Sequence, residues 1–231
     1  ASGFNRPPKI YDSSEEIAMP RIDLKQGEQK KHVARALKEI RAGYVIVAPL
    51  EHGYVYLADA FSPFAVRAMH VLRGDEIGVA AQVLAYSLDT VKGISRAVSP
   101  STQELCKKFW PGLLSVTLQP SSLLSWDLGD NKELDWFNVR VPKSKFVRAL
   151  LKESGPLAVA SASGAGHEPM LRIDRAKVKD WDVAAIFDTG ALKSGPRSTI
   201  IEADAVDVRL VREGAISFDE MEKVAPNISY I

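Results

Sequence analysis

The sequence has little of several residue types and patterns that would point to particular protein classes. It has one cysteine, Cys106, in 231 residues, which excludes an internal disulfide and a cysteine-based zinc site and fits a reducing compartment. The four histidines stand singly, without a His-x-x-x-His pair, which argues against a metal hydrolase. No apolar run approaches the roughly 20 residues that cross a membrane.

The sequence also lacks an excess of charge of one sign and the common motifs of nucleotide-binding proteins and serine hydrolases. Thirty basic residues face 29 acidic ones, so the formal net charge is only +1 and no overall field favours nucleic acid or a membrane surface. No G-x-G-x-x-G opens a helix, and neither a P-loop nor a G-x-S-x-G elbow is present. The usual dinucleotide fold, a P-loop enzyme and a serine hydrolase of that type are therefore not supported.

What remains is an ordinary globular composition, 46% hydrophobic and 26% charged, in which strand and helix patterns alternate. We expect an extended, proline-punctuated arm over residues 1–26, with a short strand near 21–24, and one domain over 27–231. The fold class predicted is α/β with a mixed, twisted sheet. Helices are expected over 28–42, 64–73, 100–109, 144–153 and 218–224. Strands are expected over 44–48, 54–57, 79–86, 113–118, 138–141, 157–160, 200–201 and 208–211. Residues 172–182 are charged and indicate a surface helix or loop.

The rest of the chain is organised around residues 155–166, GPLAVASASGAG. An apolar run breaks here into small residues, which predicts a buried strand followed by a loop without bulk. The hydroxyls of Ser161 and Ser163 and the loop N–H groups are donors of the kind that bind phosphate or carboxylate. An ordinary tight turn after a core strand explains the same pattern equally well.

Other polar residues also follow or interrupt apolar runs. Gln82 interrupts one strand, and Arg140 lies in a short apolar strand, where a charge needs a partner or an anionic ligand. Arg73, Arg140 and Arg212 lie beside strand ends, and Ser198 and Thr199 form a second hydroxyl pair. Each arginine alone is explained by a surface ion pair. Together with the hydroxyls, they favour binding of phosphates or carboxylates, with transfer between bound substrates by positioning and electrostatics.

The ordered set of motifs resembles the YrdC-like family, the threonylcarbamoyl-AMP synthases (TsaC type). The resemblance covers roughly residues 28–218. The family's Pro-Thr-(Asp/Glu)-Thr-(Val)-Tyr-Gly-Leu motif is similar to residues 49–56, PLEHGYVY, and its Lys-x-Arg falls at 73–75, RGD. Further matches are WPGLLS at 110–115, VRVP at 139–142, SASGAG at 161–166, ST at 198–199 and REG at 212–214.

The resemblance implies a YrdC-like twisted open sheet with flanking helices around a central cavity. It also implies an ATP-dependent enzyme that joins L-threonine, bicarbonate and ATP into threonylcarbamoyl-adenylate, with Mg²⁺ expected, for the modification of tRNA. Carried over by position, the ATP-binding residues are Arg73, Ser115, Ser161, Ser163 and Arg212. The amino-acid-binding residues are Leu50, His52, Tyr54, Gln82, Arg140, Ser198 and Thr199.

The sequence departs from the family pattern at several of these positions. Leu50 and His52 replace the motif threonines, Ser163 replaces the asparagine, and Ala165 replaces the second serine. Asp75 reverses the charge of the second basic residue where polyphosphate should lie, which opposes phosphate binding unless a cation intervenes.

These departures keep alternatives open. A catalytically inactive paralogue that serves as a structural or binding subunit of an assembly is the second hypothesis, and an RNA-binding module is the third. We expect a cytoplasmic protein, or one inside an organelle, because the chain starts at Ala1 rather than Met and a removed targeting peptide stays open. A protein partner bound through residues 1–26 is also expected, whereas tRNA would be involved only indirectly.

Overall fold

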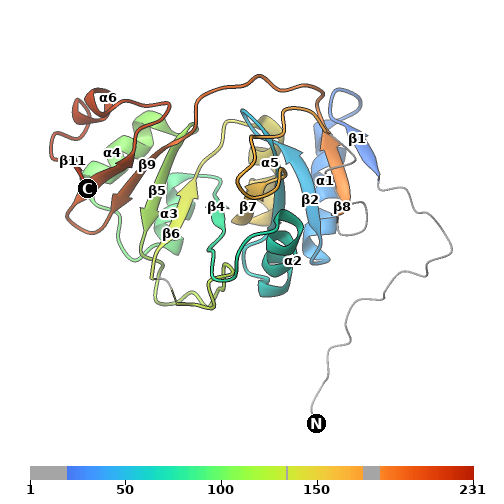
Figure 1. Cartoon of the computed structure of the whole chain (residues 1–231), viewed down its shortest axis with the longest axis horizontal. Coiled ribbons are helices and arrows are strands. Elements are labelled where there is room, and N and C mark those ends of the chain that lie inside the picture. Colours follow the sequence, from blue (N-terminus) through green and yellow to red (C-terminus); the bar gives the residue numbers. More distant parts are fainter. Residues whose placement is uncertain (1–19, 134, 174–182) are drawn as a thin grey trace, which may run out of the picture.

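The structure, a computed structural model, describes residues 20–133, 135–173 and 183–231, and eleven strands in these ranges form one sheet. The sheet runs along the length of the molecule, from β1 at one end to β11 at the other (Figure 1). The strands are β1 (Arg21–Asp23), β2 (Val45–Pro49), β3 (Tyr54–Asp59), β4 (Gln82–Leu84), β5 (Leu114–Leu118), β6 (Phe137–Arg140), β7 (Leu157–Ser161), β8 (Val183–Asp188), β9 (Thr199–Ala203), β10 (Val208–Arg212) and β11 (Ser229–Tyr230).

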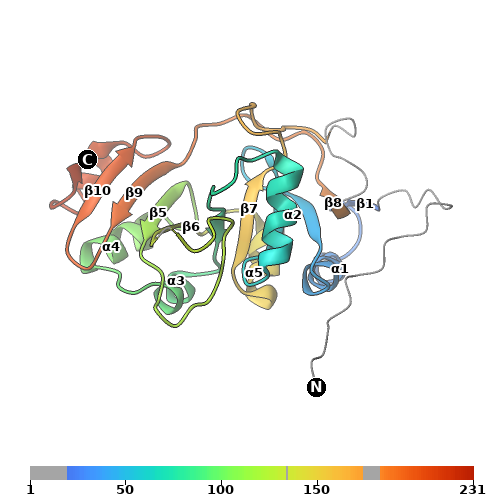
Figure 2. The same ribbon diagram turned by 60° about the horizontal axis from the view of Figure 1, so that its bottom comes forward.

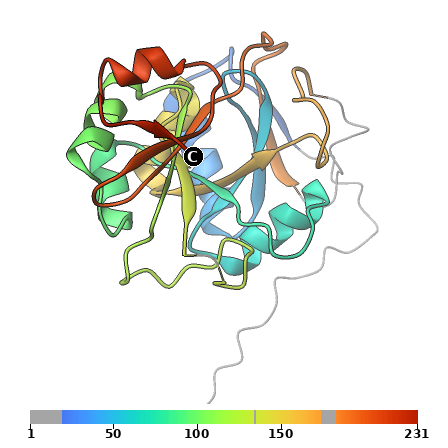
Figure 3. The ribbon, with the colours of Figure 1, turned by 60° about the vertical axis from the view of Figure 1, so that its left-hand side comes forward.

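The strand order differs strongly from the chain order: β1-β8-β2-β3-β7-β4-β6-β5-β9-β10-β11. Five neighbouring pairs are parallel (β1–β8, β8–β2, β4–β6, β5–β9, β10–β11) and the other five are antiparallel, so the sheet is mixed. Seen from the C-terminal end, the strands cross the view in different directions, which is the expected twist (Figure 3). The predicted α/β fold with an open, twisted mixed sheet is confirmed.

Six helices in the described residues accompany this sheet. They are α1 (Gln29–Arg41), α2 (Pro63–Arg73), α3 (Leu88–Ile94), α4 (Pro100–Phe109), α5 (Lys145–Ser154) and α6 (Phe218–Glu222). A serine hydroxyl accepts a backbone N–H at the start of all but α1, at positions 62, 87, 99, 144 and 217. Such a cap satisfies one of the free N–H groups and contributes about 1 kcal/mol.

Two hydrophobic clusters lie on opposite faces of the sheet. Buried residues of α1 and α5 pack against alternate side chains of β2, β3, β7 and β8, such as Ile46, Leu57 and Phe187. The larger cluster contains buried residues of α2, α3 and α4 and the other alternate side chains, such as Val47 and Tyr56. Figure 2 shows α2 in front of β7. Leu84 of β4 also belongs to the cluster with α1 and α5, whereas β6, β5 and β9 contribute no residue to it, so these helices lie against the β8-to-β4 half of this face.

Most predicted elements are present, with a few differences. The strand predicted over 79–86 is reduced to Gln82–Leu84, and three elements, α3, β8 and β11, were not predicted. The predicted short strand near 21–24 is β1, which pairs with β8. Most of the predicted 1–26 arm, and all but the first two residues of the charged segment 172–182, lie outside the described residues. None of the helices in the described ranges is both long and apolar enough to cross a membrane.

Candidate functional site

Polar side chains gather on the sheet face that α1 and α5 leave uncovered. Val83, Val116 and Val139 belong to the main core on the opposite face. Because side chains alternate along a strand, their neighbours Gln82 on β4 and Asn138 on β6 point to the uncovered face. The same alternation places Ser115 and Thr117 of β5 and Arg140 of β6 there. A polar face on a buried sheet needs hydrogen-bond partners, either within the protein or on a ligand.

These side chains form one hydrogen-bonded chain across β4, β6 and β5 that ends at Ser198, the residue before β9. Gln82 Nε2 donates to the carbonyl oxygen of the Asn138 side chain and lies 3.1 Å from Ser115 Oγ, another acceptor. Ser115 Oγ in turn donates to Ser198 Oγ at 3.1 Å, and Asn138 Nδ2 donates to Thr117 Oγ1 at 2.9 Å. The structure thus brings together three predicted site residues from distant parts of the chain: Gln82, Ser115 and Ser198.

Strand register places the predicted phosphate loop beside this polar face. Gln82 pairs with Val159 of β7, and Ser161, two residues further along β7, faces the same side. Ser161 Oγ lies 2.6 Å from Ser163 Oγ, so the two hydroxyls are joined by a hydrogen bond. The predicted loop is therefore preorganised, and its serines lie at the border of the polar face.

Arg73 lies next to the same loop. The N–H of Ala165 donates to the Arg73 carbonyl at 3.1 Å, which fastens the loop to the C-terminal end of α2. The Arg73 side chain is 30% exposed, and its Nη1 lies 3.3 Å from Asp75 Oδ1. Its Nε is buried and has no hydrogen-bond partner among the described residues.

The Asp75 carboxylate points inward and is only 4% exposed. Besides Arg73, it contacts His70, whose Nδ1 lies 2.8 Å from Asp75 Oδ2. The other His70 nitrogen, Nε2, lies 2.8 Å from the carbonyl oxygen of Leu128. The charge reversal seen in the sequence is therefore buried in a local network rather than exposed to solvent.

Arg140, the charged residue in a short strand, has a protein partner. Its Nη1 lies 3.0 Å from Glu51 Oε2, and both side chains are at least 90% buried. Nη1 also lies 3.3 Å from the Gly112 carbonyl, and Glu51 Oε1 accepts the Lys143 N–H at 2.5 Å. A buried ion pair of this kind fixes the guanidinium at the polar face and leaves its position well defined.

Arg212 joins the site through backbone contacts. Its Nη2 donates to the Ser198 carbonyl at 2.8 Å. Partial burial, with the nearby charge of Arg197, lowers the pKa of Arg212 from its usual range. Thr199, by contrast, is fully buried: its hydroxyl donates to the Ile216 carbonyl and accepts two N–H groups of the 214–216 turn. Thr199 therefore holds this turn and has no hydroxyl capacity left for a ligand.

Two predicted amino-acid-binding residues are core residues in the structure. Leu50 is 8% exposed and packs in the α1–α5 cluster. Tyr54 is fully buried, and its hydroxyl lies 2.6 Å from Asp188 Oδ1 and 3.0 Å from the Thr189 N–H, which donates to it. Burial, followed by the Asp188 hydrogen bond, raises the pKa of the Tyr54 phenol far above its ordinary value. Neither side chain belongs to the site described here.

His52 contacts the connection between β8 and β9, residues 189–198, which we call the strap. The strap runs along one edge of the sheet from β8 to β9 (Figures 1 and 2). His52 Nδ1 donates to the Lys193 carbonyl at 3.0 Å, and the ring leaves no room for a Cβ atom at Gly195. His52 thus secures the strap that ends at Ser198.

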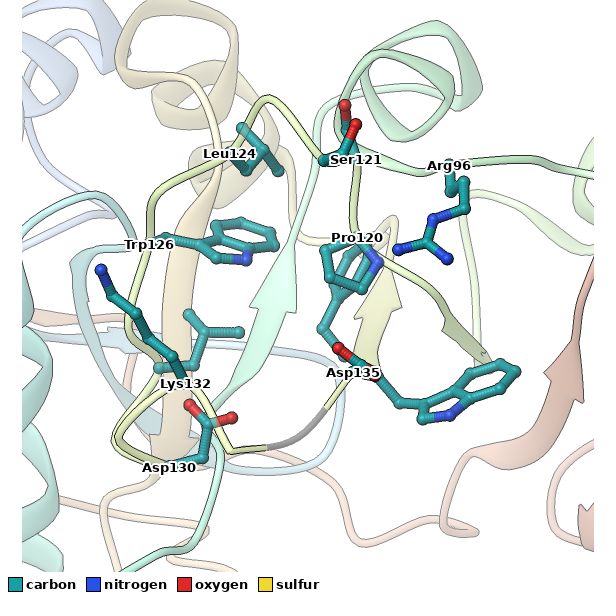
Figure 4. A pocket seen from close by; sticks show the side chains of 12 residues that line it. Arg96, Pro120, Ser121, Leu124, Trp126, Asp130, Lys132 and Asp135 are labelled. Carbon is teal, nitrogen blue, oxygen red and sulfur yellow. The ribbon is translucent and has the colours of Figure 1, made fainter.

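The described residues offer no cluster of metal ligands, but they line a pocket, which lies in the loop that carries Leu128. Among the described residues, no group of three or more His, Cys, Asp or Glu side chains could hold a metal ion. A pocket of about 190 Å³ opens in the loop between β5 and β6. Its lining includes Trp126, Leu128 and Phe137 of the main core, with Arg96 and Asp135 at its rim (Figure 4).

Sequence reasoning missed four residues that hold the site together: Glu51, His70, Thr117 and Asn138. Asn138 alternates with apolar residues in β6, so its place on a polar face could have been read from that strand. His70 and Glu51 gave no such signal, because their partners Leu128 and Arg140 are distant in the sequence.

Comparison with known proteins identifies the family of the chain. The family model Sua5_yciO_yrdC, described as "Telomere recombination", matches residues 38–214. A Mycobacterium tuberculosis protein named "Putative threonylcarbamoyl-AMP synthase" is 31% identical over 205 residues, which is 88% of this chain and 94% of the relative. The threonylcarbamoyl-AMP synthase of Pyrococcus abyssi is 25% identical over 90% of this chain and 61% of its own length.

Solved structures show the same fold. A P. abyssi Sua5 variant, H234A/Y235A, superposes with a TM-score of 0.79 at 25% identity, over 91% of this chain and 61% of that one. P. abyssi Sua5 complexed with L-threonine gives a TM-score of 0.78 at 24% identity, over 92% and 62% of the two chains. E. coli YciO gives 0.72 at 23% identity, over 87% and 98%. The chain thus spans about three fifths of Sua5 and nearly all of YciO.

Proposed function

The chain belongs to the Sua5–YciO–YrdC family, and on that premise we propose that it is a threonylcarbamoyl-AMP synthase that has diverged at several ligand positions. The reaction joins L-threonine, bicarbonate and ATP to threonylcarbamoyl-adenylate, with release of pyrophosphate and water. The amine of threonine forms a carbamate with bicarbonate. A carbamate oxygen then attacks the α-phosphorus of ATP, and the bond to pyrophosphate breaks.

The observation that carries this proposal is the hydrogen-bonded polar face formed by Gln82, Ser115 and Ser198. Ser115 is fully buried and holds the half-buried Gln82 and Ser198 in fixed positions, with the guanidinium of Arg140 held at the same face. Such an arrangement supplies orientation and charge stabilisation rather than a nucleophile. The reaction proposed here needs no protein nucleophile, since the carbamate attacks ATP directly.

We place the two substrates at different parts of the site. Arg73, Ser161, Ser163 and Arg212 would bind the phosphates, because arginines and preorganised donors suit these oxygens. Arg140 and Ser198 would hold the carboxylate of the amino acid, with Gln82 and Ser115 between the two parts.

Mg²⁺ would reach the site with the phosphates of ATP, because no metal-ligand cluster is found among the described residues. We further propose that the product serves tRNA modification in the cytoplasm. A protein partner for residues 1–26 stays a prediction.

The test is isothermal titration of the protein with ATP and Mg²⁺, alone and with L-threonine and bicarbonate, followed by an assay of pyrophosphate release. We expect micromolar to sub-millimolar ATP affinity that the amino acid strengthens, and pyrophosphate release that depends on all three substrates. Ser115→Ala should weaken binding, because it interrupts the chain between Gln82 and Ser198. Ser121→Ala, in the β5–β6 loop, is the matched control.

One observation favours the second candidate, a catalytically inactive binding subunit. Leu50, at the position of a motif threonine, is buried in the core and offers no hydroxyl. A folded protein that shows no heat with millimolar ATP and no pyrophosphate release would overturn the synthase proposal and support this alternative.

A further inference from the structure

Asp75 stands where the family motif has its second basic residue. It belongs to a network of three residues. Asp75 contacts His70 on one side and Arg73 on the other. The Asp75 and His70 side chains are 4% and 11% exposed, so little water lies between them. The network is built into the fold rather than formed by chance at the surface.

Its third contact comes from a distant loop. His70 Nε2 faces the Leu128 carbonyl at 2.8 Å, and the following residue, Gly129, lies so close that a Cβ there would be 2.4 Å from Nε2. Gly129 also has φ +104°, a conformation that side chains rarely adopt. The β5–β6 loop is thus shaped around the His70 ring and fixes its orientation.

The hydrogen bonds determine the charge of the network. A carbonyl can only accept, so Nε2 of His70 carries a hydrogen. The short contact between Nδ1 and the Asp75 carboxylate needs one more proton between the two atoms. Whichever atom holds that proton, His70 and Asp75 together are neutral, and Arg73 adds one positive charge.

We propose that His70 neutralises Asp75, so that the Arg73 guanidinium keeps its attraction for a phosphate group, while Asp75 holds that guanidinium in position. His70 and Asp75 are positioning residues in this inference, and Arg73 is the group that contacts the phosphate. The inference rests on the proposed function, because it assumes that ATP phosphates bind at Arg73.

Two observations place Arg73 where this role is useful. Its carbonyl accepts the Ala165 N–H of the loop that carries Ser161 and Ser163. Its side chain is 30% exposed, so part of the guanidinium faces solvent, where a phosphate group can reach it.

The charge balance predicts how substitutions at His70 and Asp75 change the affinity for ATP. His70→Gln leaves Asp75 uncompensated, so the network falls from one positive charge to zero, and ATP should bind about tenfold more weakly. Asp75→Asn removes one negative charge and the shared proton, so the net charge and the ATP affinity should stay within about threefold of the wild type. The double variant regains the positive charge, and Asp75→Asn should therefore rescue His70→Gln.

The experiment measures ATP affinity by titration calorimetry for the three variants and the wild type, with His32→Gln in α1 as the matched histidine control. Urea unfolding in parallel separates stability from affinity, because a merely structural role would give the double variant the lowest stability and no rescue of binding. The ¹⁵N signals of the His70 ring report on the shared proton without ATP: Asp75→Asn should shift the Nδ1 signal.

The outcomes distinguish this inference from the proposed function. Normal ATP binding by the wild type without rescue in the double variant, or an Nδ1 signal unaffected by Asp75→Asn, would overturn the network alone. Absence of ATP binding by the wild type would overturn the proposed function and the phosphate role of Arg73. The His70 signals would then still decide whether the shared proton exists.

Discussion

At the scale of single residues, the Asp188 carboxylate connects three strands of the sheet. It lies at the end of β8 and binds Arg21 of β1, with Arg21 Nε at 2.7 Å, and Tyr54 of β3. It also accepts the Gly190 N–H at 2.7 Å. Burial opposes its charge, but the hydrogen bonds from Tyr54, Gly190 and Arg21 outweigh burial and lower the pKa of Asp188 below 3.8.

A lowered pKa in the folded state makes stability depend on pH. The unfolded chain binds a proton on Asp188 near its ordinary pKa, whereas the folded protein binds it only at lower pH. The contribution of Asp188 is therefore present above about pH 4 and is lost as the pH falls through the lower, folded-state pKa.

Asp188→Asn should remove this dependence and lower the free energy of unfolding at pH 7 by about 1–3 kcal/mol, because the asparagine leaves Arg21 without a charged partner. Urea unfolding between pH 7 and pH 3 measures the change. The variant should lose less stability than the wild type at the acidic end. Asp89→Asn, at an exposed position in α3, is the control and should keep the wild-type slope; an equal slope in Asp188→Asn would contradict the assignment.

Glu51 gives a second prediction at this scale. Glu51→Gln leaves the buried Arg140 guanidinium without a counter-charge, and removal of one partner of a buried pair costs about 3–5 kcal/mol. Urea unfolding at pH 7 should show most of this loss. Glu104→Gln is the matched control, because its pair with Lys107 is more than half exposed and should change stability by less than about 1 kcal/mol.

If the chain is active, Glu51→Gln should also raise the KM for the amino acid more than it lowers kcat. Glu51 fixes the guanidinium that we place against the substrate carboxylate. An unchanged KM, together with the expected loss of stability, would mean that the pair serves the fold alone.

At the scale of elements, the strap over residues 189–198 joins β8 to β9 across the sheet. It is secured where His52 donates to the Lys193 carbonyl and where Gly195 lies against the His52 ring. Since the strap ends at Ser198, its position bears directly on the polar face.

Gly195→Ala should displace either the His52 ring or the strap, because the new Cβ would lie 2.3 Å from two ring atoms. The contact is exposed and the His52 ring is the far end of its side chain, so the ring can turn aside and we expect a loss of less than about 1 kcal/mol in the free energy of unfolding. In combination with His52→Ala the effects should be clearly less than additive, because both changes remove the same contact. Gly93→Ala, in α3 with open space around it, should be neutral or stabilising. Full additivity of the two changes would show that the contact is absent in solution.

The sequence predicted the elements well where local chemistry defines them. Apolar periodicity together with Gly74 and Gly155 at helix ends located α2 and α5 within one residue of their bounds. The sequence reasoning missed α3, because seven residues are too few to show a clear helical periodicity, although Ser87 at its N-cap is an ordinary signal for a helix start. It overextended β4, because residues 79–81 are apolar but do not continue the strand pairing.

At the scale of the whole molecule, the site could be predicted only in part. The hydroxyls and arginines were identified from the motifs, but the order β7-β4-β6-β5-β9 places Gln82, Ser115 and Ser198 side by side, and strand order cannot be read from local patterns. For the same reason the sequence assigned Tyr54 and Thr199 to a ligand. Their partners, Asp188 and the 214–216 turn, come from distant segments and occupy their hydroxyls.

The sheet order also predicts how the whole protein responds to its substrates. The polar face joins β7 and β4 to β9 and β10, so a ligand bound there contacts strands from the middle of the sheet to near its β11 end and stabilises them together. Binding of ATP at 100 times its Kd would add about 2.7 kcal/mol to the free energy of unfolding. For a domain of this size each kcal/mol corresponds to about 2–4 °C in Tm, so we expect a rise of about 5–11 °C.

Thermal unfolding with ATP and Mg²⁺, then with L-threonine and bicarbonate added, measures this response. The rise with all substrates should exceed the sum of the separate rises, because the carboxylate at Arg140 and the phosphates at Arg73 and Arg212 would be held by one continuous face. Arg212→Gln should reduce the rise with ATP and leave the Tm of the free protein within about 2 °C, since Arg212 is exposed. Separate, purely additive rises would mean that the two ends of the face bind independently, which argues against adenylate formation between them.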